Sequence, residues 1–127
     1  MADERGVTLS FPATSERVRL ARVLAATLAD EAGFDYDEVE DVRIAVDELC
    51  FALLDAGDTV GTFDITAVAA PGDLRISGVC NFVNEPRPST DETNAELTAQ
   101  ILGTVVDDYT VAFEGGTGRF SLRKTRS

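Results

Sequence analysis

Hydrophobic and polar positions alternate with two different periods along the chain. Over residues 6–11 every second residue is apolar, which predicts a short strand. Over residues 18–28 apolar residues recur at intervals of three and four, as on the buried face of a helix. We expect this helix to be capped by Thr14 or Ser15 and to end before Gly33, which stands where a C-terminal capping glycine belongs.

A second helix is predicted to begin sharply. Asp35 and Glu38 have the spacing of a capping box, in which each side chain accepts a hydrogen bond from the backbone of the other residue. The helix should end near Asp55, before Gly57. Its second half is richer in apolar residues and should therefore lie deep in the core. The apolar residues at helical spacing are Val39, Val42, Val46, Leu49, Cys50 and Leu53.

The second half of the chain predicts two pairs of strands. Residues 59–70 and 74–82 alternate apolar and polar side chains around a proline-glycine turn, which predicts a hairpin. A last pair is predicted around residues 109–113 and 120–122, joined by a glycine-rich turn. The basic tail, residues 123–127, is expected to be frayed.

A third helix is predicted between the two pairs of strands. Residues 83–93 form a polar loop with two prolines, and the helix is capped by Ser89 or by Thr93. Its expected apolar stripe consists of Leu97, Ile101 and Val105.

These elements do not alternate regularly, which disfavours a parallel sheet with crossover helices. We therefore predict an α+β fold, a two-layer sandwich with a mixed, mostly antiparallel sheet and three helices on one face. With 127 residues the chain fits one domain over 1–127, with frayed ends at about 1–5 and 125–127.

Composition narrows the classes of function. The formal net charge is −12, from 23 acidic and 11 basic residues, so the surface repels nucleic-acid phosphates and favours a basic or mixed-charge protein partner. Acidity alone also keeps a small domain soluble. The chain has no histidine, which excludes histidine ligands for metals and histidine bases. Cys50 and Cys80 follow no metal-ligand spacing, and we interpret them as buried small hydrophobes.

No run of about 18 apolar residues is present, so no membrane span is predicted. The first residues, MADERGVTL, are charged and lack the apolar core of a secretory signal. A cytoplasmic location is the expectation.

Residues 18–49, VRLARVLAATLADEAGFDYDEVEDVRIAVDEL, carry the most specific signal. They resemble the GHKL (gyrase and histidine-kinase-like ATPase) domain of bacterial anti-sigma factors, above all the RsbW-type family of serine-protein kinases. The order of elements fits that family, and the closing GGTGRFSL is similar to its last glycine motif and final strand. The resemblance implies the GHKL fold.

Members of this family bind ATP and Mg²⁺, and the resemblance places Glu48 at the position of the general base. The metal-binding asparagine expected four residues later is replaced by Ala52, which has no oxygen to offer Mg²⁺. The final glycine motif is kept, and it implies cofactor-binding roles for Gly115, Gly116 and Thr117.

Two further family motifs are missing. Where the family has Asp-x-Gly-x-Gly, residues 78–83 read GVCNFV, and Asn81 is left to accept a hydrogen bond. Where the family's ATP lid has Gly-x-Gly-Leu, residues 94–97 read NAEL, and Glu96 would repel phosphates. We therefore expect a degenerate nucleotide site, without a metal ion and with little or no use of ATP; residual binding of ATP and Mg²⁺ is the alternative.

The resemblance also implies partners. The family's arginine at the position of Arg22 contacts the sigma factor and its antagonist, and Arg19 is a second candidate on the same patch. Otherwise Arg22 is a solvated residue that pairs with Glu16 or Asp30. The expected partners are a sigma factor, a STAS-type anti-sigma-factor antagonist and a second copy of the chain, which would dimerise through the first strand and first helix.

Two functions follow from this pattern. The first is a regulatory binding protein that sequesters a sigma factor. The second is a serine/threonine kinase that phosphorylates the antagonist, with a divergent ATP site built on Glu48 and Thr117. Ala52 and the missing glycines favour the first. A scaffold or heterodimer partner for an active homologue is a third possibility.

Overall fold

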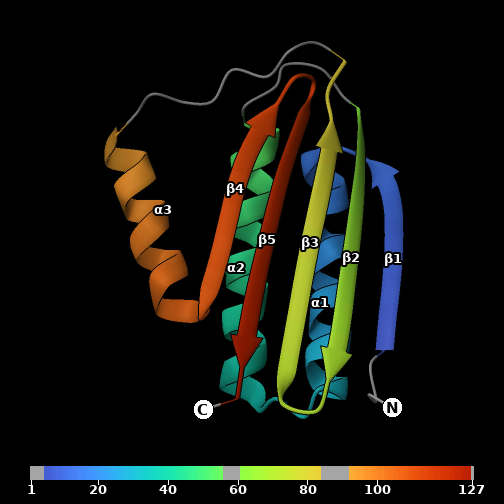
Figure 1. The fold of residues 1–127 in the computed structure, drawn as a ribbon, viewed down its shortest axis with the longest axis vertical. Helices are drawn as coiled ribbons and strands as arrows, with labels where there is room; N and C mark the ends of the chain where they lie inside the picture. The colour runs from blue at the N-terminus through green and yellow to red at the C-terminus, as the bar shows by residue number, and fades with distance from the viewer. Residues whose placement is uncertain (1–4, 56–60, 84–91, 127) are drawn as a thin grey trace.

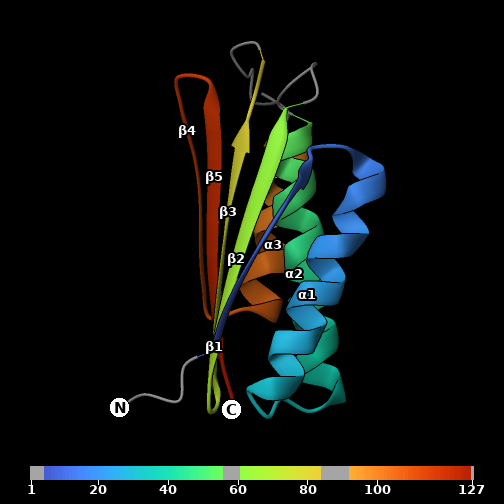
Figure 2. The same cartoon turned by 90° about the vertical axis from the view of Figure 1, so that its right-hand side faces the viewer.

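The structure, a computed structural model, describes residues 5–55, 61–83 and 92–126. They form one five-stranded sheet with three helices on one of its faces (Figures 1 and 2). A 3₁₀ turn, Ser15–Arg17, leads into the first helix. The helices are α1 (Val18–Glu31), α2 (Tyr36–Leu54) and α3 (Glu92–Val105), and the strands are β1 (Arg5–Pro12), β2 (Thr62–Ala70), β3 (Asp73–Asn81), β4 (Asp108–Glu114) and β5 (Thr117–Thr125).

The strand order is β1-β2-β3-β5-β4, and every pairing in it is antiparallel. The predicted two-layer α+β sandwich is therefore confirmed, and the described sheet holds no parallel pair. The predicted strand residues 59 and 60, the cap at Ser89 and most of the 83–93 loop lie outside the described residues.

Alternation along β2 and β3 divides the sheet into a core face and an outer face. The core face of β2 carries Phe63, Ile65, Ala67 and Ala69, which are at most 2% exposed. The ring of Phe63 packs at 5.7 Å from that of Phe11 on β1 and at 6.3 Å from that of Phe120 on β5. Each large side chain buried here stabilises the fold by about 1.5–3 kcal/mol. This aromatic row joins three strands beneath the helices.

The ends of α1 and α2 follow local sequence signals. The Asp35 carboxylate accepts from the Glu38 backbone N–H at 2.8 Å, and the Glu38 carboxylate accepts from the Asp35 N–H at 3.0 Å, which confirms the capping box. Gly33 has φ +85°, the left-handed conformation expected of a glycine that follows a helix. The predicted cap at Thr14 is wrong in detail, because Thr14 makes no capping hydrogen bond and precedes the 3₁₀ turn.

The stripe predicted for α3 is partly wrong. Leu97 is 55% exposed, whereas Leu102, which the pattern missed, is 1% exposed. Figure 1 shows the C-terminal end of α3 joining β4, while its first turns lie farther from the sheet. Burial therefore concentrates at the end of the helix, where Val105 is also buried.

The expected frayed tail is wrong for residues 123–125, which complete β5. Lys124 in this segment is buried, at 9% exposure. Beyond the strand, the Arg126 N–H donates to the Gly72 carbonyl at 2.9 Å. Among the described residues, no helix is both long and apolar enough to cross a membrane.

Candidate functional site

Glu48 lies on the flank of α2 that looks towards β5 and α3. Asp41, seven residues earlier on the same flank, lies 3.4 Å from the ammonium group of Lys124 on β5. Glu48 is partly exposed, and within the described residues its carboxylate makes no hydrogen bond, including none to Thr117. Ala52, one turn later, presents only a methyl group. Three and four residues before and after Glu48, α2 carries only apolar side chains, so no second oxygen ligand lies beside the Glu48 carboxylate on this helix.

The other residues predicted to bind a cofactor meet at one end of the sheet. Asn81 of β3 lies directly opposite Thr117 of β5. The Phe82 N–H donates to the Gly116 carbonyl at 2.9 Å, and Gly115 turns the β4–β5 hairpin with φ +59°. The structure thus brings Asn81, Gly116 and Thr117 together at this end of the sheet.

This group does not converge on Glu48. Cys80 is 1% exposed and faces the helices, so Asn81, the next residue of the strand, points to the outer face. The amide of Asn81 donates to the Thr62 hydroxyl at 3.3 Å on that face, and Thr117 shares the same register row. Glu48 comes from the helix layer. The predicted site residues are therefore divided between the two faces of the sheet.

Apolar side chains occupy the helix side of this sheet end. The rings of Phe82 and Phe113 are 6.5 Å apart. A Cβ at Gly118 would lie 3.0 Å from both Leu53 Cδ2 and Phe113 Cε1, so these side chains pack directly on the glycine backbone. Gly118 was predicted in the turn, whereas the structure places it inside β5, where a glycine allows such close approach.

Arg22, the first candidate for partner contact, is ion-paired across the α1–α2 hairpin. Its Nε lies 3.3 Å from Asp47 Oδ1 and its Nη1 donates to Asp47 Oδ2 at 3.4 Å. The side chain remains 38% exposed. Within the described residues Arg22 makes no ion pair with Glu16 or Asp30, the partners expected as the alternative, and it pairs with Asp47 of the neighbouring helix instead.

The environment of Asp47 opposes its ionisation. Burial raises the pKa of the Asp47 carboxyl, and the nearby guanidinium groups of Arg22 and Arg43 lower it by less. Its Oδ1 atom is buried and, although within ion-pair distance of Arg22, accepts no hydrogen bond from the described residues. The Arg22–Asp47 pair is therefore incompletely satisfied.

Arg19 and Arg22 lie on an exposed region of the helix layer that also carries apolar side chains. Arg19 lines a shallow cavity of about 390 Å³ with Glu16 and Arg17. Val23 is 63% exposed and Phe51 is 36% exposed. We call Arg19, Arg22, Val23 and Phe51 the α1–α2 surface.

Comparisons with known proteins agree with this architecture. No family model matches the chain. The serine-protein kinase RsbW of Halalkalibacterium halodurans is 36% identical over 61 residues, which are 47% of this chain and 38% of the kinase. RsbW of Bacillus cereus is 39% identical over 44 residues, 35% of this chain and 28% of the kinase. The chain thus covers well under half the length of these relatives.

A solved structure extends the likeness to nearly the whole chain. The structure of the RsbU and RsbW domains of Rv1364c from Mycobacterium tuberculosis superposes with a TM-score of 0.73 at 16% identity, covering 95% of this chain and 32% of that one. The protein has the GHKL-type fold. The expectation drawn from residues 18–49 is confirmed at the level of the fold.

Proposed function

We propose that this GHKL-fold protein is a cytoplasmic regulatory binding protein of the anti-sigma-factor type, which holds its partner with little or no use of ATP. The observation that carries the second half of the proposal is the division of the predicted nucleotide residues. Glu48 stands on the helix side of the sheet, whereas Asn81 and Thr117 face the other side. This division supports the proposal that the protein does not depend on a magnesium nucleotide.

The similarity to RsbW kinases and the α1–α2 surface support a role in protein binding. Exposed Val23 and Phe51 supply apolar contact area, and Arg19 and Arg22 supply positive charge on an acidic protein. Such a surface suits a partner segment that combines apolar and acidic residues. We propose a sigma factor or a STAS-type antagonist as that partner, and a second copy of the chain as a further one.

A serine/threonine kinase that phosphorylates the antagonist is the second candidate. It is favoured by the similarity to RsbW serine-protein kinases and by Glu48, which is partly exposed on α2. In that case Glu48 would accept the proton of the attacking hydroxyl group. The candidate has to operate without an oxygen ligand at Ala52.

Calorimetric titration with Mg-ATP, up to millimolar concentrations, separates the two candidates. The proposal expects no saturable heat with the wild-type protein and none with Glu48→Ala. An Ala52→Asn variant tests whether putting the family's metal-binding asparagine back at this position restores binding of Mg-ATP. Saturable binding to the wild type that Glu48→Ala abolishes would overturn the proposal in favour of the kinase.

Partner capture tests the binding surface independently of nucleotide. Purified sigma factors and STAS-domain proteins from the same genome are titrated against the wild type, Arg22→Glu and Arg43→Glu. Arg43 is the matched control, because it is exposed on α2 and its ion pair is with Glu40 at 2.7 Å, while its charge reaches Asp47 without an ion pair. We expect Arg22→Glu to weaken binding at least tenfold and Arg43→Glu to leave it unchanged. Equal losses in both variants would refute the assigned surface.

A further inference from the structure

The outer face of the sheet, opposite the helices, carries a row of hydroxyl side chains, one from each strand. In register order they are Thr8, Thr66, Ser77, Ser121 and Thr110. The outer members bond in pairs, Thr8 with Thr66 at 3.0 Å and Thr110 with Ser121 at 2.6 Å. The central hydroxyl, that of Ser77, has no hydrogen-bond partner among the described residues. The row therefore keeps an unused donor at the middle of the sheet.

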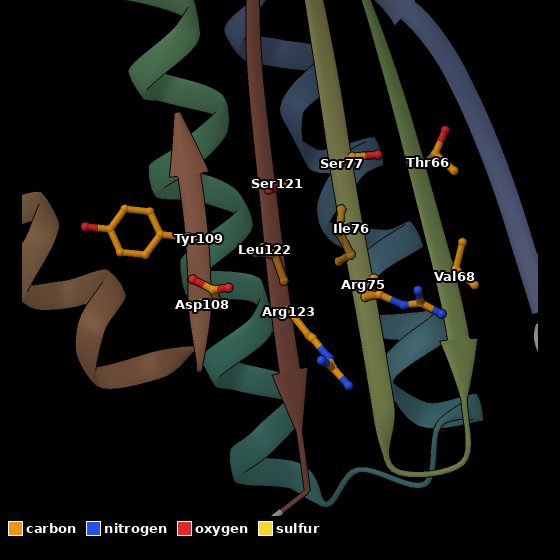
Figure 3. Close-up of a pocket in the computed structure, with 10 residues that line it drawn as sticks. All are labelled: Thr66, Val68, Arg75, Ile76, Ser77, Asp108, Tyr109, Ser121, Leu122 and Arg123. Carbon is orange, nitrogen blue, oxygen red and sulfur yellow. The ribbon is translucent and has the colours of Figure 1, made fainter. Parts of the chain in front are cut away.

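Two arginines lie beside the centre of this row. Arg75 of β3 and Arg123 of β5 are directly opposite each other, two residues along from Ser77 and Ser121. The Arg-x-Ser of β3 thus lies opposite the Ser-x-Arg of β5, and the Cα atoms of the four residues form a rectangle of roughly 5 by 7 Å. Figure 3 shows them on adjacent strands.

The placement of these arginines is costly for the sheet by itself. Like charges directly opposite each other destabilise a strand pair. Asp73 offsets part of the repulsion by accepting from Arg123 Nε at 3.1 Å and from Nη2 at 3.0 Å. Arg119 of β5, two residues before Ser121, adds a third guanidinium group, which makes no ion pair in the described part of the chain. Three guanidinium groups therefore lie near Ser77 and Ser121, and the charges of Asp73, Asp107 and Asp108 act on that of Arg123.

A cavity of about 300 Å³ lies over this constellation. Arg75, Ser77, Ser121 and Arg123 line it, together with Thr66 and Asp108 (Figure 3). Its volume matches the lower end of small-ligand sites. Guanidinium and hydroxyl groups supply only donors towards an anion, and the guanidinium fork fits phosphate oxygens.

We propose that the cavity binds a phosphate group, held between the guanidinium groups of Arg75 and Arg123 and the hydroxyl groups of Ser77 and Ser121. Two guanidinium groups and two hydroxyl groups around one cavity suit the several oxygen atoms of a phosphate group better than a planar carboxylate. Asp108, opposite Arg123 on β4, is the one carboxylate lining the cavity among the described residues, and it repels the bound anion. Removing the charge of Asp108 therefore strengthens phosphate binding. This gain is not expected if Asp108 only stabilises the fold.

NMR titration of the wild-type protein with sodium phosphate, at constant ionic strength maintained with sodium chloride, tests the site. We expect saturable shifts at the amides of Ser77, Ser121 and Arg75. Arg75→Gln should weaken binding at least tenfold, and Asp108→Asn should strengthen it several-fold. Arg43→Gln, which removes the same charge from α2, is the control and should bind like the wild type.

The phosphate has two possible sources, a small phosphorylated molecule or a phosphorylated side chain of a protein. Phosphoserine and a phosphoserine heptapeptide are titrated in parallel to distinguish them. Tighter binding of the peptide supports the site with a protein source, and equal binding supports it with a small-molecule source. Shifts that do not saturate, or equal weakening by Arg75→Gln and Arg43→Gln, overturn the proposal.

Discussion

The ammonium group of Lys124 donates a 2.8 Å hydrogen bond to the carbonyl oxygen of Val105, the last residue of α3. The same group lies 3.4 Å from the carboxylate of Asp41 on α2. A cation at this position satisfies a carbonyl that the helix end leaves unpaired and interacts favourably with the helix dipole. One side chain of β5 therefore fastens α3 to α2.

Lys124→Met should destabilise the protein by about 1–3 kcal/mol, because it leaves the buried Val105 carbonyl without a donor. Urea unfolding measures the change, with Arg119→Met as an exposed control on the same strand. Asp41→Asn should cost less, since the bond to Val105 is kept and Asp41 is 38% exposed. Equal losses for Lys124→Met and Arg119→Met would contradict the anchoring role.

Gly78→Ala should destabilise the core. A Cβ at Gly78 would lie 2.7 Å from Phe120 Cζ and 2.9 Å from Ile65 Cδ1, so the aromatic row would have to move. Overpacking of this kind costs about 1–3 kcal/mol. Gly103→Ala on α3 meets no atom within 4 Å and should instead stabilise by about 0.5–1 kcal/mol through helix propensity. Thermal or urea unfolding of the two variants should give opposite signs.

Asp107 should make the fold sensitive to acid. Its carboxylate accepts from the Thr125 N–H at 2.6 Å and from the Thr125 hydroxyl at 2.7 Å, and these bonds hold its pKa below the usual 3.8. Because the folded-state pKa is depressed, this stabilisation is complete above the unfolded pKa and is lost as the pH falls through the folded value. Asp107→Asn should therefore lose less stability than the wild type between pH 5 and pH 2, measured by urea unfolding at each pH.

The contribution of Asp47 to stability should depend on pH in the opposite direction to that of Asp107. Burial raises the pKa of its carboxyl, so the folded state binds the proton more tightly and stability falls as the pH rises through the raised value. Asp47→Asn removes this penalty, and at pH 7 its stability should lie within about 1 kcal/mol of the wild type, because Arg22 remains solvated. Asp47→Asn should also bind the partner more tightly, since Arg22 no longer pairs within the chain. Weaker binding would contradict the role proposed for Arg22.

Both cysteines should resist thiol reagents in the folded protein. Cys50 and Cys80 are buried and free, and burial raises the pKa of the Cys80 thiol to about 11 and that of Cys50 as well. At pH 8 only about one Cys80 thiol in a thousand would be ionised, even if the reagent could reach it. A disulfide reagent should therefore label neither residue in buffer and both in denaturing urea. Rapid labelling in buffer would show that α2 opens from the sheet.

Signals confined to a few neighbouring residues predicted their structures well. The Asp35–Glu38 capping box depends on contacts three residues apart, and it forms as expected. Alternation along β2 predicted its buried face because period two is a property of the strand itself. The resemblance over residues 18–49 then gave the GHKL fold, which the order of elements alone did not specify.

Features set by packing between distant segments were predicted poorly. Leu97 fits the apolar period of α3, yet it is exposed because only the end of that helix is well buried. The Arg22–Asp47 pair depends on how two helices dock, and the sequence suggested partners within one helix. Likewise, the outward direction of Asn81 depends on strand register, where a shift of one residue reverses the face. The basic composition of residues 123–127 suggested a frayed tail, whereas backbone pairing places Lys124 in the sheet.

The position of β5 between β3 and β4 has a consequence for synthesis on the ribosome. The β4 strand is made before β5, and within the sheet it pairs with no other strand. Until residues 117–125 emerge, β4 has no neighbour and one edge of β3 stays open, while β1, β2 and β3 can already pair. Until β5 has been made, the nascent chain thus exposes unpaired backbone N–H and C=O groups along β3 and β4, which can pair with other chains. Premature termination after β4 would leave a three-stranded remnant prone to aggregate, whereas the loss of a few residues before β1 would not open the centre of the sheet.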